Sequence, residues 1–171
     1  MNYKIEAIDV LINDDCILNR YYALIPYKAT LISNLQRSGI VSKEECFSLA
    51  DDFLFQMGLP DVDIVNLFRS FLVMYDVKPQ KLREIEKVSS CEEEIKSFHE
   101  LYLLPGVKEI RARLYYEAGY KFLADIAAVL PEQIIYDTGE VIIQKNLDLK
   151  VPLLKEVKTH IAVAKAYTYY Q

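Results

Sequence analysis

Residues that can close a tight turn are scarce in this chain, and this scarcity constrains the fold more than any other feature. The 171 residues include only 5 Gly and 6 Pro. A β-sandwich needs a turn signal about every 8–12 residues. The sequence therefore predicts a mostly α-helical, multi-helix fold and disfavours an all-β architecture.

Two adjacent segments carry the start signals of helices. Ser42 is followed three residues later by Glu45, which is the capping-box pattern, and apolar residues then recur at helical spacing. Asp61 has a side chain preferred at a helix N-cap and precedes a second periodic run. We expect helices over residues 42–58 and 61–76.

Weaker patterns of the same kind run through the rest of the chain. They predict helices over residues 26–38, 79–88, 90–104 and 152–170. The sequence Asp-Thr-Gly-Glu, which starts at Asp137, lies between two apolar runs. It favours a loop between helices, with a short β-hairpin over residues 134–145 as the alternative. In total we expect about seven to nine helices.

The expected helices fall into two groups. A change of composition at residues 87–90, Lys-Val-Ser-Ser, marks a soft boundary. The division is an N-terminal helical region, residues 1–88, and a second region, residues 89–171, that ends in a closing helix. A single compact domain is the alternative, since 171 residues can bury one core.

The distribution of charge limits the partners that this chain can attract. The net charge is −5 and the isoelectric point is near 5.1, so the molecule as a whole does not attract phosphate. Residues 1–103 carry 11 basic and 17 acidic side chains, whereas residues 104–130 carry 4 and 3. Only this second segment is mildly positive.

Cysteine spacing and hydropathy indicate a cytoplasmic protein. Cys16, Cys46 and Cys91 are widely spaced and form no Cys-x-x-Cys pair, which disfavours a zinc site and a disulfide framework. The N-terminal segment becomes acidic at once and lacks a signal-peptide pattern. No apolar run approaches the roughly 18 residues of a membrane span, so no membrane partner is expected.

One stretch, residues 103–127, has a recognisable motif. It contains Leu-Pro-Gly-Val from Leu104, then Ala112, and an Ala-Gly pair that ends at Gly119. This arrangement resembles the helix-hairpin-helix family, in which a Leu-Pro-Gly turn precedes a helix that ends in Ala-Gly. The following Tyr-Lys-Phe-Leu-Ala-Asp-Ile-Ala is similar to the second helix of the family. The resemblance covers about 25 residues and identifies a module rather than a whole protein.

The resemblance implies a site for a nucleic-acid backbone. The turn would present unpaired backbone N–H groups at a helix N-terminus, where an anion binds, and a glycine would let a phosphate approach closely. In this chain Lys108 replaces the second turn glycine of the family. The residues expected to face the phosphates are Gly106, Val107, Lys108, Arg111, Tyr115 and Lys121.

Helical spacing also assigns the other side chains of this module. Ile110, Leu114 and Ala118 lie four residues apart and are expected to face the core. Arg113 lies four residues from both Glu109 and Glu117, so we expect it to be neutralised by them on a solvated side.

A weaker, similar pattern occurs near the N-terminus. Residues 24–49 also run from a proline, Pro26, through an apolar-patterned helix to a glycine, Gly39. This segment is a candidate degenerate second hairpin, although it lacks a glycine after the proline.

No motif points to catalysis. His99 and His160 each lie among apolar residues and are interpreted as structural histidines. Asp61 and Asp63 fit an N-cap and a first helical turn better than a metal site. The sequence therefore predicts no enzyme activity, no cofactor and no metal. Three tyrosines near the C-terminus, Tyr167, Tyr169 and Tyr170, are expected to dock with the last helix rather than to remain free.

The sequence thus predicts a non-catalytic helix-hairpin-helix-like binding protein. Its partner would be the backbone of DNA or RNA, contacted without sequence specificity. The alternative is a protein–protein interaction module that does not bind nucleic acid.

Overall fold

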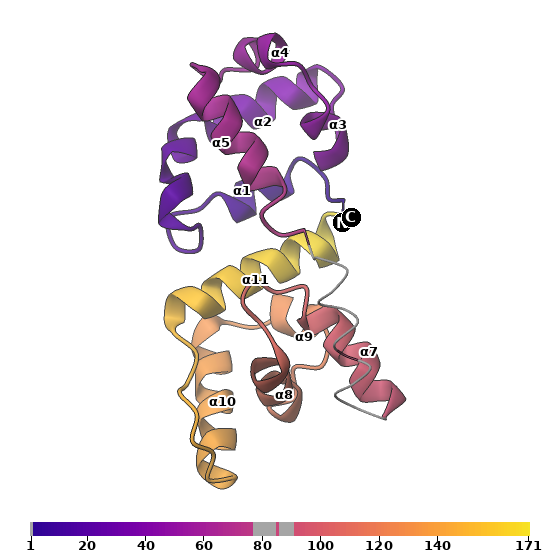
Figure 1. Ribbon diagram of the computed structural model, residues 1–171, viewed down its shortest axis with the longest axis vertical. Coiled ribbons are helices and arrows are strands. Elements are labelled where there is room, and N and C mark those ends of the chain that lie inside the picture. Colours follow the sequence, from indigo (N-terminus) through magenta and orange to yellow (C-terminus); the bar gives the residue numbers. More distant parts are fainter. Residues whose placement is uncertain (1, 77–84, 86–90) are drawn as a thin grey trace.

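The computed structural model describes residues 2–76, 85 and 91–171 (Figure 1). Over these residues the chain forms ten α-helices and one 3₁₀-helix and no β-strand, which confirms the mostly α fold. The elements are α1 (Ala7–Leu11), η1 (Asn19–Tyr27), α2 (Lys28–Arg37), α3 (Lys43–Phe47), α4 (Asp51–Gln56), α5 (Val62–Leu72), α7 (Glu92–Leu101), α8 (Glu109–Glu117), α9 (Leu123–Ala127), α10 (Pro131–Gln144) and α11 (Leu154–Tyr169).

The last helix, α11, crosses the middle of the molecule. Helices α1 to α5 lie on one side of it and α7 to α10 on the other, and the two chain ends meet beside it (Figure 1). The meeting of the ends is fixed by a backbone hydrogen bond of 2.6 Å from Lys4 N to Tyr170 O. One group of buried apolar residues extends through both sides and includes seven residues of α11, from Val157 to Tyr167.

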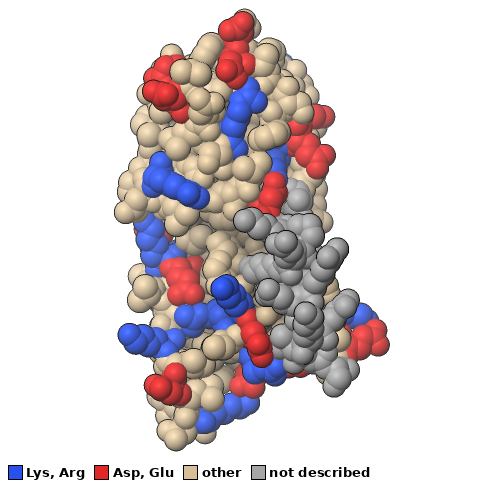
Figure 2. Space-filling model, in the orientation of Figure 1, with Lys and Arg blue, Asp and Glu red and all other residues tan. Residues whose placement is uncertain are grey.

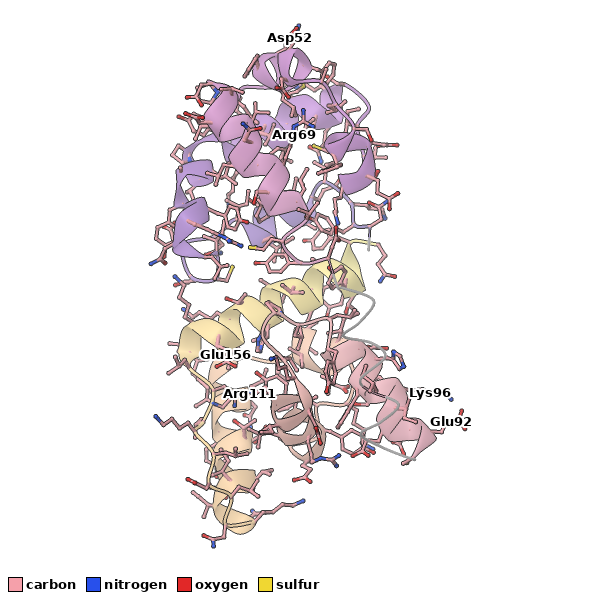
Figure 3. All side chains as sticks on the ribbon, in the orientation of Figure 1. Asp52, Arg69, Glu92, Lys96, Arg111 and Glu156 are labelled. Carbon is pink, nitrogen blue, oxygen red and sulfur yellow. The ribbon has the colours of Figure 1, made fainter. Side chains whose placement is uncertain are left out.

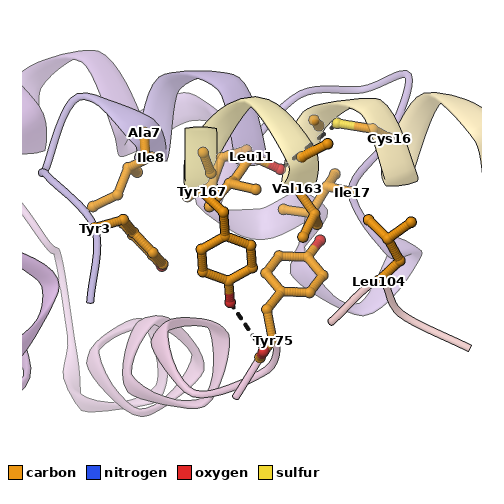
Figure 4. Packing of buried hydrophobic residues seen from close by; sticks show 14 of the residues in the cluster. Tyr3, Ala7, Ile8, Leu11, Cys16, Ile17, Tyr75, Leu104, Val163 and Tyr167 are labelled. Atoms are coloured by element: carbon orange, nitrogen blue, oxygen red, sulfur yellow. Dashed lines mark hydrogen bonds between the residues drawn. The ribbon is translucent and has the colours of Figure 1, made fainter. Parts of the chain in front are cut away.

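Polar side chains of α11 reach the N-terminal helices from within this core. Thr159 donates to the carbonyl oxygen of Cys16 over 2.6 Å. The Tyr167 hydroxyl donates to the carbonyl oxygen of Tyr75 over 3.1 Å (Figure 4). Tyr167 is 3% exposed, so the last helix docks as expected, whereas Tyr169 is 56% exposed and does not. The proposed division near residues 87–90 stays a prediction, because that boundary lies outside the described residues.

The expected helix over residues 42–58 is two helices. The capping box is present, since Ser42 accepts from Glu45 N and the Glu45 carboxylate accepts from Ser42 N. Ala50 then takes an extended conformation, with φ −69° and ψ 156°, and its carbonyl oxygen starts α4. This break is one reason why the number of helices exceeds the expected seven to nine. The second expected cap is confirmed: Asp61 accepts from Ile64 N over 2.9 Å.

Two other expected helices start later than predicted. Pro26 lies inside the 3₁₀-helix η1, and α2 begins only at Lys28. Helix α7 begins at Glu92, and the Ser90 cap expected for it lies outside the described residues, as does almost all of the expected helix 79–88.

The expected loop or hairpin within residues 134–145 is wrong. This segment belongs to α10, which is continuous from Pro131 to Gln144. The Thr138 hydroxyl donates to the carbonyl oxygen of Ile134 one turn earlier, over 2.6 Å. Gly139 faces the returning chain, because a Cβ at this position would lie 3.8 Å from Val151 Cγ2. Thr138 and Gly139, which suggested a turn in the sequence, therefore both lie inside a helix.

The chain contains two structurally equivalent units whose residue numbers differ by 80. Helices α2 and α8 end at residues 37 and 117, α3 and α9 span residues 43–47 and 123–127, and α4 and α10 begin at residues 51 and 131. The first unit includes the segment that resembled a second hairpin. The name helix-hairpin-helix stays a prediction for both units.

Matching hydrogen bonds shape the glycine turn in each unit. Gly39 and Gly119 have φ of +77° and +94°, the left-handed conformation that closes a helix. The next residue donates back into the helix in each case, from Ile40 N to Leu35 O and from Tyr120 N to Tyr115 O. In both units this pattern ends the first helix and turns the chain into the second.

A carboxylate then starts the second helix of each unit. Glu45 accepts from the backbone N–H groups of residues 41 and 42, and Asp125 accepts from those of residues 121 and 122. Each acid supplies partners for two N–H groups at its helix N-terminus.

Candidate nucleic-acid interface

A tight turn places the N-terminus of α8 at the surface. Val107 N donates to Leu104 O over 3.3 Å, with Pro105 and Gly106 between them. Gly106 has φ +75°, as the residue after proline has in a type II turn, and a Cβ added there would meet no atom within 4 Å. The backbone at Gly106 is therefore open to a ligand.

The replacement of the second family glycine does not strain the turn. Lys108 has φ −128° and ψ −174°, an extended conformation that any residue adopts. The side chain at this position therefore adds a cation without a conformational penalty.

The first N–H groups of α8 are available to an anion. The helical hydrogen bonds start with Ala112 N, which donates to Lys108 O over 2.8 Å. No described side chain caps this end of the helix. The N–H groups of residues 109–111 therefore lack partners within the helix and lie at the positive end of its dipole.

A hollow of about 310 Å³ lies beside this helix end. Its lining is Gly106, Lys108, Ile110, Arg111, Leu149, Lys150 and Glu156. Three of these side chains are cationic and one is a carboxylate. Lys150 comes from the segment before α11, and sequence reasoning missed it because no local motif surrounds it.

Arg111 joins α8 to that segment. Its Nε lies 3.1 Å from Glu156 Oε1, and its Nη1 donates to Lys150 O over 3.3 Å. Figure 3 shows Arg111 and Glu156 directed toward each other beneath α11. This ion pair offsets part of the positive charge of the hollow and fixes the position of Lys150.

Lys108 and Lys150 supply the remaining charge. Both residues are exposed, and neither forms an ion pair within the described part of the chain. Basic side chains gather at the lower left of the surface, with acidic ones among them (Figure 2). The candidate site is thus a local cationic hollow on an acidic protein.

Two of the expected phosphate-facing residues are buried instead. Val107 and Tyr115 are both 0% exposed, so Tyr115 cannot stack on a base from this position. The Tyr115 hydroxyl lies 2.7 Å from His160 Nδ1, and His160 Nε2 lies 2.9 Å from the carbonyl oxygen of Pro105. Sequence spacing alone does not identify this contact with α11.

The geometry assigns the protons of this buried chain of hydrogen bonds. A carbonyl oxygen only accepts, so His160 Nε2 donates to Pro105 O, and in the neutral imidazole Nδ1 accepts from the Tyr115 hydroxyl. Burial and the nearby Glu156 raise the pKa of Tyr115, which keeps its hydroxyl protonated. His160 is therefore structural, as expected, and holds the turn of the candidate site against α11.

The third expected cation, Lys121, does not line the hollow. Its Nζ lies 2.7 Å from Glu93 Oε1 and 5.1 Å from the centre of the Tyr116 ring. The hydrogen bond and charge of Glu93 raise the pKa of Lys121. Lys121 therefore links the segment before α9 to α7 instead of extending the site.

The expected orientation of α8 is wrong at two positions. Ile110 is 64% exposed, whereas Ala112 and Tyr115 fill the core. The guanidinium of Arg113 lies 2.6 Å from Glu94 Oε1 of α7 and 5.5 Å from the Phe98 ring centre, rather than between Glu109 and Glu117. Helix α8 packs against α7 and α10, and Tyr115 contacts His160 of α11.

Other reactive chemistry is sparse in the described chain. The residues described contain no group of three or more His, Cys, Asp or Glu side chains able to hold a metal ion. Burial raises the pKa of the Cys16 thiol to about 11 and that of Cys46 to about 12, which keeps both unreactive. None of the helices described is long and apolar enough to cross a membrane.

Comparison with protein-family models, with curated proteins and with solved structures gives no match for this chain.

Proposed function

We propose that this protein binds the phosphates of a nucleic-acid backbone in the hollow at the N-terminus of α8, without catalysis. One observation carries the proposal: Lys108, Arg111 and Lys150 converge on a helix end with open N–H groups. Cations and helix N-termini both favour anions, and phosphates are the anions that they position best.

The lining of the hollow favours contact without sequence specificity. It offers charges and backbone N–H groups to phosphate oxygens, and none of its lining residues is aromatic. Since DNA and RNA share the phosphate group, the proposal applies to both. With three cations, one of them paired with Glu156, and a net charge of −5, we expect weak binding.

Titration of labelled duplex and single-stranded DNA tests the proposal. Contact with two or three phosphates should weaken duplex binding roughly 10- to 40-fold between about 50 mM and about 200 mM salt. An absence of binding to either DNA at the lower salt concentration would contradict the proposal.

A pair of matched variants locates the binding. Lys108→Glu with Lys150→Glu reverses the two unpaired cations of the hollow and should abolish binding. Lys4→Glu with Lys96→Glu changes the net charge equally at exposed positions outside the hollow. The control should retain most of the affinity, and equal losses in the two proteins would place the binding elsewhere.

A second candidate function, protein–protein interaction, is supported by a different surface. Helix α10 carries Tyr136 and Ile143 at 63% and 74% exposure, and Leu153 beyond it is 74% exposed. Large apolar side chains exposed close together are typical of a binding surface.

A further inference from the structure

Helix α10 buries little of its length. Of its 14 residues only Ile134 and Thr138 are buried. The helix continues through residues 137–144, beyond the position equivalent to the end of α4. In Figure 1 this part runs along the edge of the molecule, away from α11. Within the added length Thr138 is buried, residues 137 and 139–142 are half-buried, and residues 143 and 144 are exposed.

The exposed side of α10 has an apolar centre. Tyr136 and Ile143 are seven residues apart, two helical turns, so their side chains project from the same side. The chain returns beside α10, since Val151 lies next to Gly139, and it exposes Val151 and Leu153. We call these four exposed apolar side chains, which belong to α10 and to the chain that returns beside it, the α10 surface.

Carboxylates border the helical part of the α10 surface, whereas the returning chain carries the exposed Lys150 next to Val151. Glu132 and Glu140 each lie four residues from Tyr136, on the same side of the helix. The sequence of α10, Pro-Glu-Gln-Ile-Ile-Tyr-Asp-Thr-Gly-Glu-Val-Ile-Ile-Gln, contains no Lys or Arg. Asp137 is engaged inside the protein, where its carboxylate accepts from the Tyr120 hydroxyl and from Gln133.

We propose that the α10 surface binds a basic amphipathic helix of another protein. The apolar side of such a helix would cover Tyr136 and Ile143, and its Lys or Arg residues would pair with Glu132 and Glu140. A second copy of this chain is a poorer occupant, because it would bring like carboxylates together. Nucleic acid would be repelled by the same carboxylates.

This proposal rests on the second candidate function and is independent of the hollow at α8. A suitable probe is a synthetic peptide of about 14 leucine and lysine residues with the leucines at helical spacing. A scrambled peptide of the same composition lacks an apolar side and should bind at least roughly tenfold more weakly, because charge alone remains. Affinities are measured by calorimetry on the whole protein.

Variants separate the apolar and charged contributions. Ile143→Lys should weaken peptide binding at least roughly tenfold, and Val41→Lys, at a position that is 58% exposed elsewhere, should not. Glu132→Lys with Glu140→Lys should weaken it similarly, whereas Asp14→Lys with Glu44→Lys gives the same charge change and little loss. Thermal unfolding confirms that each variant is folded.

A charge-swapped peptide completes the test. A leucine and glutamate peptide should bind the Glu132→Lys, Glu140→Lys protein and not the original one. The proposal is overturned if the lysine peptide does not bind, if the control variants lose as much affinity, or if the swapped peptide fails to restore binding. Loss of DNA binding in the Lys108, Lys150 variant with peptide binding intact would show that the two surfaces act separately.

Discussion

The two equivalent units share the turn that follows their first helix and begin differently. In both, a left-handed glycine closes the first helix and an acid starts the second. Helix α2, however, continues directly from the 3₁₀-helix η1, whereas α8 follows a Pro-Gly turn and has an open N-terminus. The glycine turn and the acid after it therefore stabilise the fold in both units. The start of the first helix gives each unit a different surface.

Lys28 and Lys108 occupy equivalent positions at the starts of α2 and α8, and their contacts differ. Lys28 lies 3.0 Å from Asp9 Oδ1 and donates to the carbonyl oxygen of Ile12 over 2.8 Å, so its charge connects α2 to α1. Lys108 points its charge into the hollow at α8. The same residue type joins one unit to α1 and supplies a candidate binding group in the other.

Truncation of the shared core position should have the largest effect. Leu35 and Tyr115 are equivalent and both 0% exposed. We expect Leu35→Ala to cost about 2–5 kcal/mol of unfolding free energy and Tyr115→Ala about 3–5 kcal/mol, measured by urea denaturation. A loss below about 1 kcal/mol at either position would mean that the two units are not equivalent in their packing.

Removal of one hydroxyl sharpens this comparison. Tyr115→Phe leaves His160 Nδ1 without the Tyr115 donor, so we expect a cost of about 1–3 kcal/mol. The N-terminal unit, with Leu35, has no counterpart of this bond. An unchanged urea midpoint for Tyr115→Phe would show that the hydrogen bond does not hold the turn to α11.

The glycine turns should respond equally to substitution. A Cβ at Gly39 or Gly119 meets no atom within 4 Å, so only the positive φ opposes a side chain. Gly39→Val and Gly119→Val should each cost about 1–2 kcal/mol, and replacement by Asn, which tolerates this conformation, should cost less. Losses that differ strongly between the two sites, in thermal or urea unfolding, would contradict the equivalence.

The capping acid gives the smallest effect on stability and a dependence on pH. Hydrogen bonds from the backbone of Val41 and Ser42 hold the pKa of Glu45 below its ordinary value. A lowered folded-state pKa stabilises the protein above the ordinary pKa, and the gain is lost as the pH falls through the folded value. The melting temperature of Glu45→Gln should therefore be lower than that of the original protein near neutral pH and should converge with it in acid. A difference independent of pH would disprove this linkage.

Local signals predicted the ends of many elements. Ser42 with Glu45, and Asp61, act on N–H groups within three residues, so the sequence contains the whole interaction. Gly119 likewise closes its helix through bonds within five residues. The Pro-Gly turn that forms the entrance to α8 belongs to the same class.

The buried side of α8 and the lining of the hollow depend on contacts between residues that are distant in sequence. Both Ile110 and Tyr115 belong to plausible apolar sides of α8, and contact with His160, 45 residues later, decides which one is buried. Lys150 joins the hollow through Arg111, 39 residues away. The relation between the two units left only the weak pattern of residues 24–49, because residues 31–54 and 111–134 share only the glycine when aligned with the offset of 80.

Chemical-shift mapping of the labelled protein with a short single-stranded oligonucleotide tests the central claim most directly. We expect the amide signals of residues 106–111 and 149–151 to move during titration and to return as salt is added, because the contact is electrostatic. Signals around Lys28 in the equivalent unit should remain in place. Shifts confined to surfaces outside the hollow, or no shifts at millimolar oligonucleotide, would contradict the account.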